Sequence, residues 1–233
     1  MRRVFMNSVR PGLDPGGHSK PNRTMKQTII IKSLFIAATL LGVAAVVRAE
    51  DPLPPSGTMG LLGQTYAGLD YSYINLEHSP KNAEGFGFQY NQSLNTGLDS
   101  ILTYDWTQTG LIAGDRARQQ TLGGALRAFS NSYSWGKPYV EAGIGYTWTK
   151  TAGVDDHSFV WDVAVGTEFQ VAPKVTVTPY VQYLDAPDLA TGNTWNFGVK
   201  ANYWVNSQWA VTGGIRANDH HSTTFTVGTN FRF

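Results

Sequence analysis

Apolar and polar side chains alternate with a period of two along most of this chain, from about residue 64 onward. In "YVEAGIGYTWT", for example, apolar residues from Val140 to Trp148 alternate with Glu, Gly and Thr. Gly, Asn, Asp and Pro interrupt the alternation at short intervals, which is typical of strands joined by tight turns. Ten strands are therefore predicted, at 64–76, 84–95, 97–110, 115–131, 137–150, 156–171, 174–186, 194–205, 208–218 and 222–233.

The two faces of these strands distinguish between a soluble and a membrane-embedded architecture. A soluble barrel or sandwich would expose its polar face to water, and that face should be rich in Lys and Glu. Here the polar face is mostly Gly, Thr, Ser, Asn and Gln, which suits a small enclosed interior. The runs span about 12–16 residues, enough for a membrane strand of roughly 9–11 and well above the usual five or six. We therefore predict an all-β, antiparallel, up-and-down transmembrane β-barrel of ten strands, with eight as the alternative.

Two further features agree with a membrane barrel. The connections between the runs are all short, and they alternate between two rims. Aromatic residues gather near the ends of the runs, as expected for rings at the level of lipid headgroups. The predicted outer girdle is Tyr73, Phe86, Trp106, Trp148, Phe159, Tyr183 and Trp195, and the inner one is Phe169, Tyr203, Trp209, Phe231 and Phe233.

One run departs from the pattern. In the fourth run, Arg116, Arg118 and Gln120 share their face with Leu122 and Leu126. We expect these three polar residues to lie above the membrane, or a β-bulge to shift them to the other face.

Charge is distributed unevenly between the N-terminal region and the rest. Residues 1–49 hold eight Lys/Arg and one acidic residue, so residues 50–233 hold 18 − 8 = 10 bases and 17 − 1 = 16 acids. The segment from Met25 has a basic start, an apolar stretch and a Val47-Arg48-Ala49 cleavage site, as in a secretory signal peptide. We predict a non-native upstream extension at 1–24, a signal peptide at 25–49, a leader segment at 50–63 and the barrel at 64–233. The acidic mature chain argues against a nucleic-acid partner.

With these features together, the chain resembles the small bacterial outer-membrane β-barrels of the OmpA-like and porin-like group, in the Gram-negative cell envelope. The resemblance implies that the last strand is an assembly signal, read by the barrel assembly machinery. The residues that match it are Phe225, Val227, Phe231 and Phe233, while Thr229 departs from the pattern. It also implies outer-membrane lipid as a partner, besides small solutes or surface ligands whose chemistry stays open.

Charged residues on the polar face are predicted to line the lumen, where they should pair or stay hydrated. By alternation they are Asp70, Asp99, Asp105, Arg127, Glu141, Asp162, Glu168, Lys200, Arg216 and Arg232. Tyr66, Tyr180 and Trp204 should also point inward. Side chains fill the interior of an eight-stranded barrel, whereas a sixteen-stranded barrel encloses an aqueous channel. Because ten strands are closer to the first case, we expect a largely occluded lumen.

Asp and His residues near the outer rim are the candidates for metal binding or acid–base chemistry. "VDDHS" and "NDHH" place Asp155 and His157, and Asp219 with His220 and His221, near loop tips. Adjacent imidazoles on a strand point to opposite faces and chelate metal poorly. The expected function is a structural or surface-binding barrel, with a narrow diffusion channel as the alternative and an omptin-like rim hydrolase as a distant third. No enzyme activity, catalytic residue, metal or cofactor is predicted.

Overall fold

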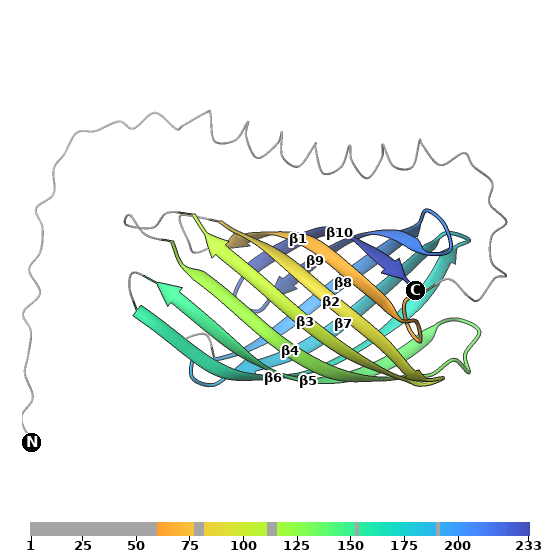
Figure 1. Ribbon diagram of the computed structural model, residues 1–233, viewed down its shortest axis with the longest axis horizontal. Coiled ribbons are helices and arrows are strands. Elements are labelled where there is room, and N and C mark those ends of the chain that lie inside the picture. Colours follow the sequence, from red (N-terminus) through yellow and green to blue (C-terminus); the bar gives the residue numbers. More distant parts are fainter. Residues whose placement is uncertain (1–59, 77–81, 111–115, 152–153, 190–191) are drawn as a thin grey trace, which may run out of the picture. The chain divides into compact units, whose positions relative to one another are not determined.

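Ten antiparallel strands form a closed barrel in the computed structural model of the chain, which describes residues 60–76, 82–110, 116–151, 154–189 and 192–233 (Figure 1). The strands are β1 (Tyr66–Leu76), β2 (Ala83–Asn95), β3 (Leu98–Thr109), β4 (Arg118–Phe129), β5 (Lys137–Thr151), β6 (Val154–Ala172), β7 (Val175–Ala186), β8 (Gly192–Trp204), β9 (Trp209–Asn218) and β10 (Ser222–Arg232). The predicted fold class and the count of ten strands are confirmed, and the eight-stranded alternative is wrong. The predicted upstream extension and signal peptide lie outside the described residues.

The barrel closes where the first strand meets the last. Each strand pairs with its neighbours in sequence, and β1 pairs with β10 from Tyr66↔Arg232 to Leu76↔Ser222. This closure leaves no unpaired strand edge, which a sheet in lipid requires because no water is present to satisfy free backbone groups. We call the end where β1 begins and β10 ends the inner rim, and the opposite end the outer rim.

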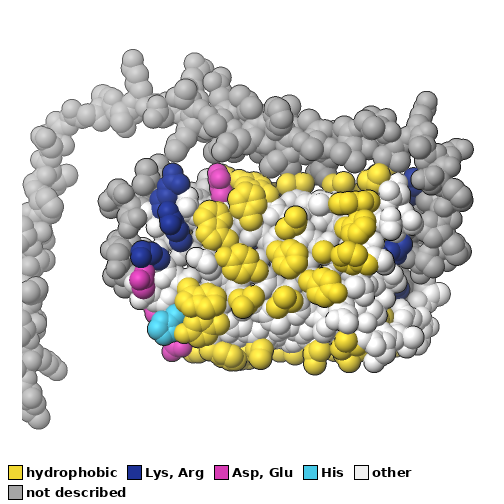
Figure 2. Space-filling model, viewed as in Figure 1, with side chains coloured by type: hydrophobic (Ala, Val, Ile, Leu, Met, Phe, Trp, Pro, Cys, Tyr) yellow, Lys and Arg dark blue, Asp and Glu magenta, His cyan; other side chains and the backbone are white. Residues whose placement is uncertain are grey.

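The apolar face points outward along the barrel wall. Leu69 is 61% exposed and Ile144 is 63% exposed, and aromatic side chains lie beside them. In Figure 2 the hydrophobic side chains form a band across the barrel, while the charged side chains gather toward its two ends. Exposure of this extent is typical of a surface in contact with lipid. In the described ranges, no helix is long and apolar enough to cross a membrane.

The aromatic residues form contacting rows along the wall. Near the outer rim, Phe86 packs on Trp106, with ring centroids 6.1 Å apart, and Tyr183 packs on Trp195 at 5.0 Å. Near the inner rim, Phe231 lies 4.8 Å from Trp209. Two further aromatics at the inner rim, Tyr133 and Trp135, were missed because they lie in the connection between two runs; their rings are 5.3 Å apart.

The irregular fourth run is a regular strand. β4 pairs with β3 and β5 in continuous register from Arg118 to Ala128, so no bulge displaces Gln120 to the inner face. Gln120 instead accepts a hydrogen bond from the hydroxyl of Tyr104 on the outer face, with the two oxygens 3.0 Å apart. Of the two expectations for this run, the bulge is therefore wrong. The described register shifts lie near inner-rim turns, one between Ser93 and Asn95 and one between Gln170 and Ala172.

Candidate functional site in the barrel lumen

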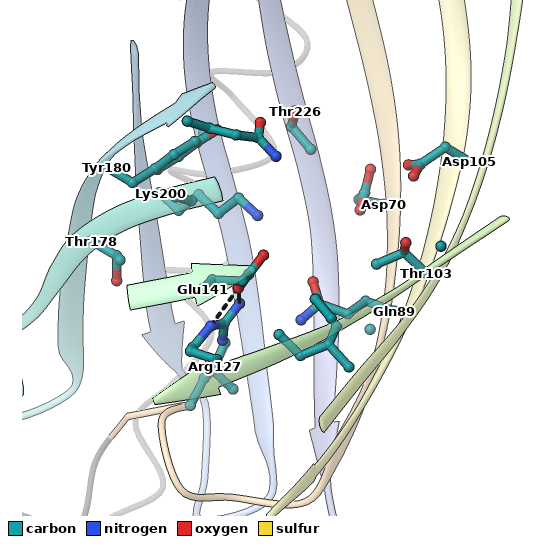
Figure 3. Close-up of a pocket in the computed structure, with 18 of the residues that line it drawn as sticks. Asp70, Gln89, Thr103, Asp105, Arg127, Glu141, Thr178, Tyr180, Lys200 and Thr226 are labelled. Carbon is teal, nitrogen blue, oxygen red and sulfur yellow. Dashed lines mark hydrogen bonds and ion pairs between the residues drawn. The ribbon is translucent and has the colours of Figure 1, made fainter. Parts of the chain in front are cut away.

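The inward faces of the strands enclose a cavity of about 340 Å³ (Figure 3). All ten strands contribute residues to its wall. Eight of the ten predicted lumen charges line it: Asp70, Asp105, Arg127, Glu141, Asp162, Glu168, Lys200 and Arg216. Asp99 is buried nearer the inner rim, and the guanidinium carbon of Arg232 lies 4.8 Å from the centre of the Trp204 ring. Tyr66 and Tyr180 line the cavity, and Trp204 is wholly buried.

Glycines on the inner face make room for two tyrosines that lie flat along the wall. Tyr139 is paired with Gly166, and Tyr180 is paired with Gly198. A methyl group on Gly166 would stand 2.6 Å from the Tyr139 hydroxyl, and one on Gly198 would stand 2.5 Å from the Tyr180 ring. Only glycine permits such close approach, and its use here keeps both rings out of the middle of the lumen.

Arg127 and Glu141 form an ion pair across neighbouring strands of the wall. They are opposite each other in the β4–β5 register. The Nε of Arg127 donates to a Glu141 carboxylate oxygen at 2.7 Å, and a second guanidinium nitrogen lies 2.6 Å from the same oxygen. The guanidinium also lies 5.1 Å from the centre of the Tyr139 ring. The side chains are only 14% and 16% exposed, so each compensates the charge of the other in a poorly hydrated place.

The remaining charges of the cavity differ in how far they are compensated. Asp162 accepts a hydrogen bond from the side chain of Gln182 at 3.0 Å. Asp70 has a long contact of 3.5 Å with the Ser72 hydroxyl, and the Lys200 ammonium lies 5.7 Å from the Tyr180 ring centre. Within the described residues, neither Lys200 nor Asp105 forms a hydrogen bond or ion pair with a protein side chain, and the same is true of Arg216.

Residues 60–64 fold into the lumen at the inner rim and are held there by inward-facing side chains; we call this segment the inner plug. The backbone N–H of Leu61 donates to a Glu168 carboxylate oxygen at 2.8 Å, and that of Gly63 donates to Asp99 at 3.0 Å. The Asn91 amide donates to the Gln64 carbonyl at 2.7 Å. Residues 60–63 were assigned to the leader; the structure places them against the barrel interior.

The inner plug crosses the inner mouth of the barrel. Leu61 packs against Trp204 of β8, whereas Gly63 is bound to Asp99 of β3. In the ring, β8 and β3 are five positions apart out of ten, so these two strands are diametrically opposite. Leu62 is only 3% exposed. The segment therefore contacts both sides of the ring and buries its central side chain at that end.

Two polar features of the inner rim were missed. Lys137 donates to the Leu62 carbonyl at 3.3 Å. It lies four residues before Glu141 and shares its parity, so the same alternation places it inside. Asn202, Thr176 and Asn230 form a buried network, with the Asn202 amide donating to Thr176 at 3.3 Å and the Asn230 amide donating to Asn202 at 3.2 Å. Alternation places neutral side chains such as Asn202 on the polar face, but it does not predict which of them bond to one another.

The acid and imidazole groups of the outer rim make local contacts. Asp155 pairs with Lys150 at 3.3 Å, and the His157 ring stacks 5.7 Å from that of Tyr146. The His220 ring nitrogen lies 2.9 Å from the Asn193 carbonyl oxygen. The Asp219 carboxylate accepts a hydrogen bond from the backbone N–H of Trp195 at 3.1 Å. His221 adopts a left-handed turn conformation, with φ of 60°. The described residues contain no group of three or more His, Asp or Glu that could hold a metal ion.

The four residues of the predicted assembly signal lie on the outward face of β10. Phe233 is 70% exposed and Phe225 is 43% exposed, and Val227 lies between them on the same face. Phe231 contacts Phe233, with ring centroids 5.1 Å apart. The hydroxyl of the exceptional Thr229 donates to the Ala210 carbonyl of β9 at 3.0 Å. This bond satisfies the Thr229 hydroxyl on the outward face of the strand.

Comparison with known proteins finds a matching family model and several similar solved structures. A family model described as an outer membrane protein beta-barrel domain matches residues 34–202. Among solved structures, the chain is similar to neisserial surface protein A, with 13% identity, coverage of 72% of this chain and 97% of that one, and a TM-score of 0.42. It is also similar to the NanC porin (9% identity, 72% and 100% coverage, TM-score 0.47) and to OprG from Pseudomonas aeruginosa (10% identity, 73% and 96% coverage, TM-score 0.38). No curated protein matches the chain.

Proposed function

The chain belongs to the family of outer membrane protein β-barrel domains, and from this premise we propose that it is an integral outer-membrane barrel with a structural or surface-binding role and an occluded polar lumen. It is not an enzyme in this proposal, and it uses neither a metal nor a cofactor. Its partners are outer-membrane lipid along the apolar band and the machinery that inserts barrels.

The inner plug is the observation that carries the proposal. Its backbone is bound by Asp99, Glu168, Lys137 and Asn91, which come from four different strands. Hydrogen bonds that involve a charged partner are roughly twice as strong as neutral ones, so three of these four are of the stronger kind. A segment fixed at several points around the ring keeps the inner mouth closed.

A narrow diffusion channel is the second candidate, and the cavity of about 340 Å³ favours it. Eight-stranded barrels have interiors filled by side chains and sixteen-stranded barrels have open channels, so ten strands leave little room. In this alternative, solutes would pass only when the inner plug leaves its site.

Conductance across a planar bilayer distinguishes the two. The purified mature chain should show small conductance steps or none. The double variant Asp99→Asn/Glu168→Gln removes both carboxylates that bind the plug, and it should conduct more often. The control is Asp70→Asn/Asp162→Asn, which removes the same charge from the lumen without touching the plug.

Each outcome of this experiment decides between the candidates. Closed wild type with an opened plug variant and a closed control supports the occluded barrel. Large, stable steps from the wild-type chain would contradict occlusion and favour the channel. Equal opening of both double variants would mean that lumen charge controls conductance and that the plug does not.

A further inference from the structure

Four charges that line the cavity, two acids and two bases, form no salt bridge among the described residues, and one acid and one base of this set lie on opposite walls. Asp105 lies on β3 and Asp70 on β1, whereas Lys200 lies on β8 and Arg216 on β9. Strands β3 and β8 are five positions apart in the ring of ten, so Asp105 and Lys200 project from opposite walls. In Figure 3, Lys200 reaches into the lumen from one side, and Asp70 and Asp105 face it from the other.

The other charges of the cavity are already satisfied. Arg127 is paired with Glu141, Asp162 accepts from Gln182, and Glu168 binds the inner plug. The two acids and two bases that remain have no salt bridge among the described residues. Asp105 and Lys200 lie on opposite walls and therefore do not pair directly, whereas Arg216 on β9 is next to the strand of Lys200 and two strands from Asp70 on β1. Charges in a confined space favour a partner.

We propose that the cavity is a binding site for a small zwitterion whose ammonium and carboxylate groups stand at opposite ends, as in a dipeptide. The ammonium would lie at Asp70 and Asp105, and the carboxylate at Lys200 and Arg216. A simple anion or cation would satisfy the two bases or the two acids and leave the other two charges uncompensated, whereas a zwitterion satisfies both sets without adding net charge. Guanidinium and ammonium groups bind carboxylates through strong charge-assisted hydrogen bonds.

The size of the cavity agrees with this ligand class. At about 340 Å³ it lies at the low end of the roughly 300–1,000 Å³ that small-molecule sites occupy. Gly87, which is paired with Asp70 on the neighbouring strand, leaves room for the Asp70 carboxylate. A methyl group there would stand 2.8 Å from an Asp70 carboxylate oxygen.

Equilibrium dialysis of labelled diglycine against the folded full-length barrel in detergent micelles tests the proposal. Unlabelled N-acetyl-diglycine lacks the ammonium, and diglycine amide lacks the carboxylate, so each retains half of the recognised chemistry. We expect saturable binding with a dissociation constant below about 10 mM and competition by either analogue at least about ten-fold weaker than by diglycine, equivalent to about 1.4 kcal/mol for each missing charge.

Matched substitutions separate this site from general charge effects. Lys200→Met and Asp105→Asn should each weaken diglycine binding about ten-fold or more. Lys150→Met and Asp155→Asn make the same chemical changes in an exposed pair at the outer rim, where the side chains are 62% and 73% exposed, and should leave binding unchanged. Only the folded fraction, measured by its migration without heating on a detergent gel, is counted.

The remaining outcomes overturn the inference. N-acetyl-diglycine competing as well as diglycine, with Asp105→Asn unaffected, would make the cavity an anion site. Diglycine amide competing as well as diglycine, with Lys200→Met unaffected, would make the cavity a cation site. No saturable binding would mean that the charges are merely hydrated. This inference rests on the proposed function for its closed cavity, but the two fail separately: bilayer conductance decides occlusion, and dialysis decides recognition.

Discussion

Arg127 and Glu141 show how the barrel tolerates charge in its interior at the scale of single residues. Each is mostly buried, and each would be an uncompensated charge without the other. Breaking a buried pair by removing one partner is strongly destabilising, whereas replacing both with apolar groups is often neutral. The contribution of this pair is therefore tested by comparing a single with a double substitution.

Arg127→Met should lower the free energy of unfolding by about 3 kcal/mol, because it strands the Glu141 carboxylate in the wall. Arg127→Met/Glu141→Met should recover most of that loss. Lys150→Met, which breaks the exposed pair with Asp155, should change stability by less than about 0.5 kcal/mol. Urea titrations followed by detergent gels measure all three. A double variant as unstable as the single one would mean that Arg127 acts through Tyr139 rather than through its ion pair.

Alternation predicts on which face a residue lies, but it does not predict the partner of that residue. Arg127 and Glu141 could have been paired from the sequence, since they flank one turn and their register follows by counting from it. The opposition of Lys200 and Asp105 across the lumen follows from the predicted up-and-down order, in which the third and eighth strands of ten are opposite, but that order does not predict that both remain without an ion pair. Lys137 was missed for a smaller reason: it is the first residue of its predicted strand, and the alternation was assigned in detail only from Tyr139 onward.

At the scale of elements, β10 carries the predicted assembly signal and also closes the barrel. Replacing both Phe231 and Phe233 with Ser should leave exported but unassembled protein, because the outward apolar pattern of the last strand is lost. The measurement is the folded band of unheated outer-membrane fractions on a detergent gel. Replacing Phe86 and Phe88 of β2 with Ser removes two outward Phe from another strand and serves as the control.

If the Phe231→Ser/Phe233→Ser variant still gives a normal folded band, the prediction that β10 carries an assembly signal is wrong. Equal loss in the β2 control would show that outward apolar area matters, wherever on the wall it lies. Loss confined to β10 is the result expected if the last strand is read during insertion.

The inner plug is the element that sequence reasoning could not find. Residues 60–64, "GLLGQ", have neither strand nor helix periodicity, and they contact Asp99 and Glu168, which lie 36 and 107 residues away. Strands are readable because their pattern repeats locally. A short segment fixed by distant side chains leaves no local trace, so residues 60–63 were assigned to the leader that precedes the barrel and Gln64 to the first strand.

At the scale of the whole molecule, the even number of strands places both ends of the barrel wall at one rim. β1 begins and β10 ends at the same rim, with the Phe233 N–H donating to the Thr65 carbonyl at 3.1 Å. In barrels of this kind the short turns face the periplasm. A protease site inserted at Gly192, at the outer rim, should therefore be cleaved on intact cells, and one inserted at Pro173, at the inner rim, should be cleaved only after lysis.

Cleavage at Pro173 on intact cells, with protection of Gly192, would reverse the orientation. Accessibility of both sites on intact cells would indicate a barrel that had not been inserted, and the folded band on a detergent gel identifies that case. The same two insertions can be examined in one preparation, because each produces fragments of different size.

The β1–β10 pairing also concentrates the entropic barrier to folding in a single event. Nine of the ten pairings join strands that are consecutive in sequence, while Tyr66↔Arg232 brings together residues 232 − 66 = 166 positions apart. The cost of closing a loop rises only with the logarithm of its length, but non-local contacts still form late and slowly. The hairpins can therefore accumulate as an open, curved sheet. Its two edge strands keep unpaired backbone N–H and C=O groups until β1 pairs with β10. A chain permuted so that its ends fell in an outer loop would keep every contact of the wall and move this vulnerable seam elsewhere.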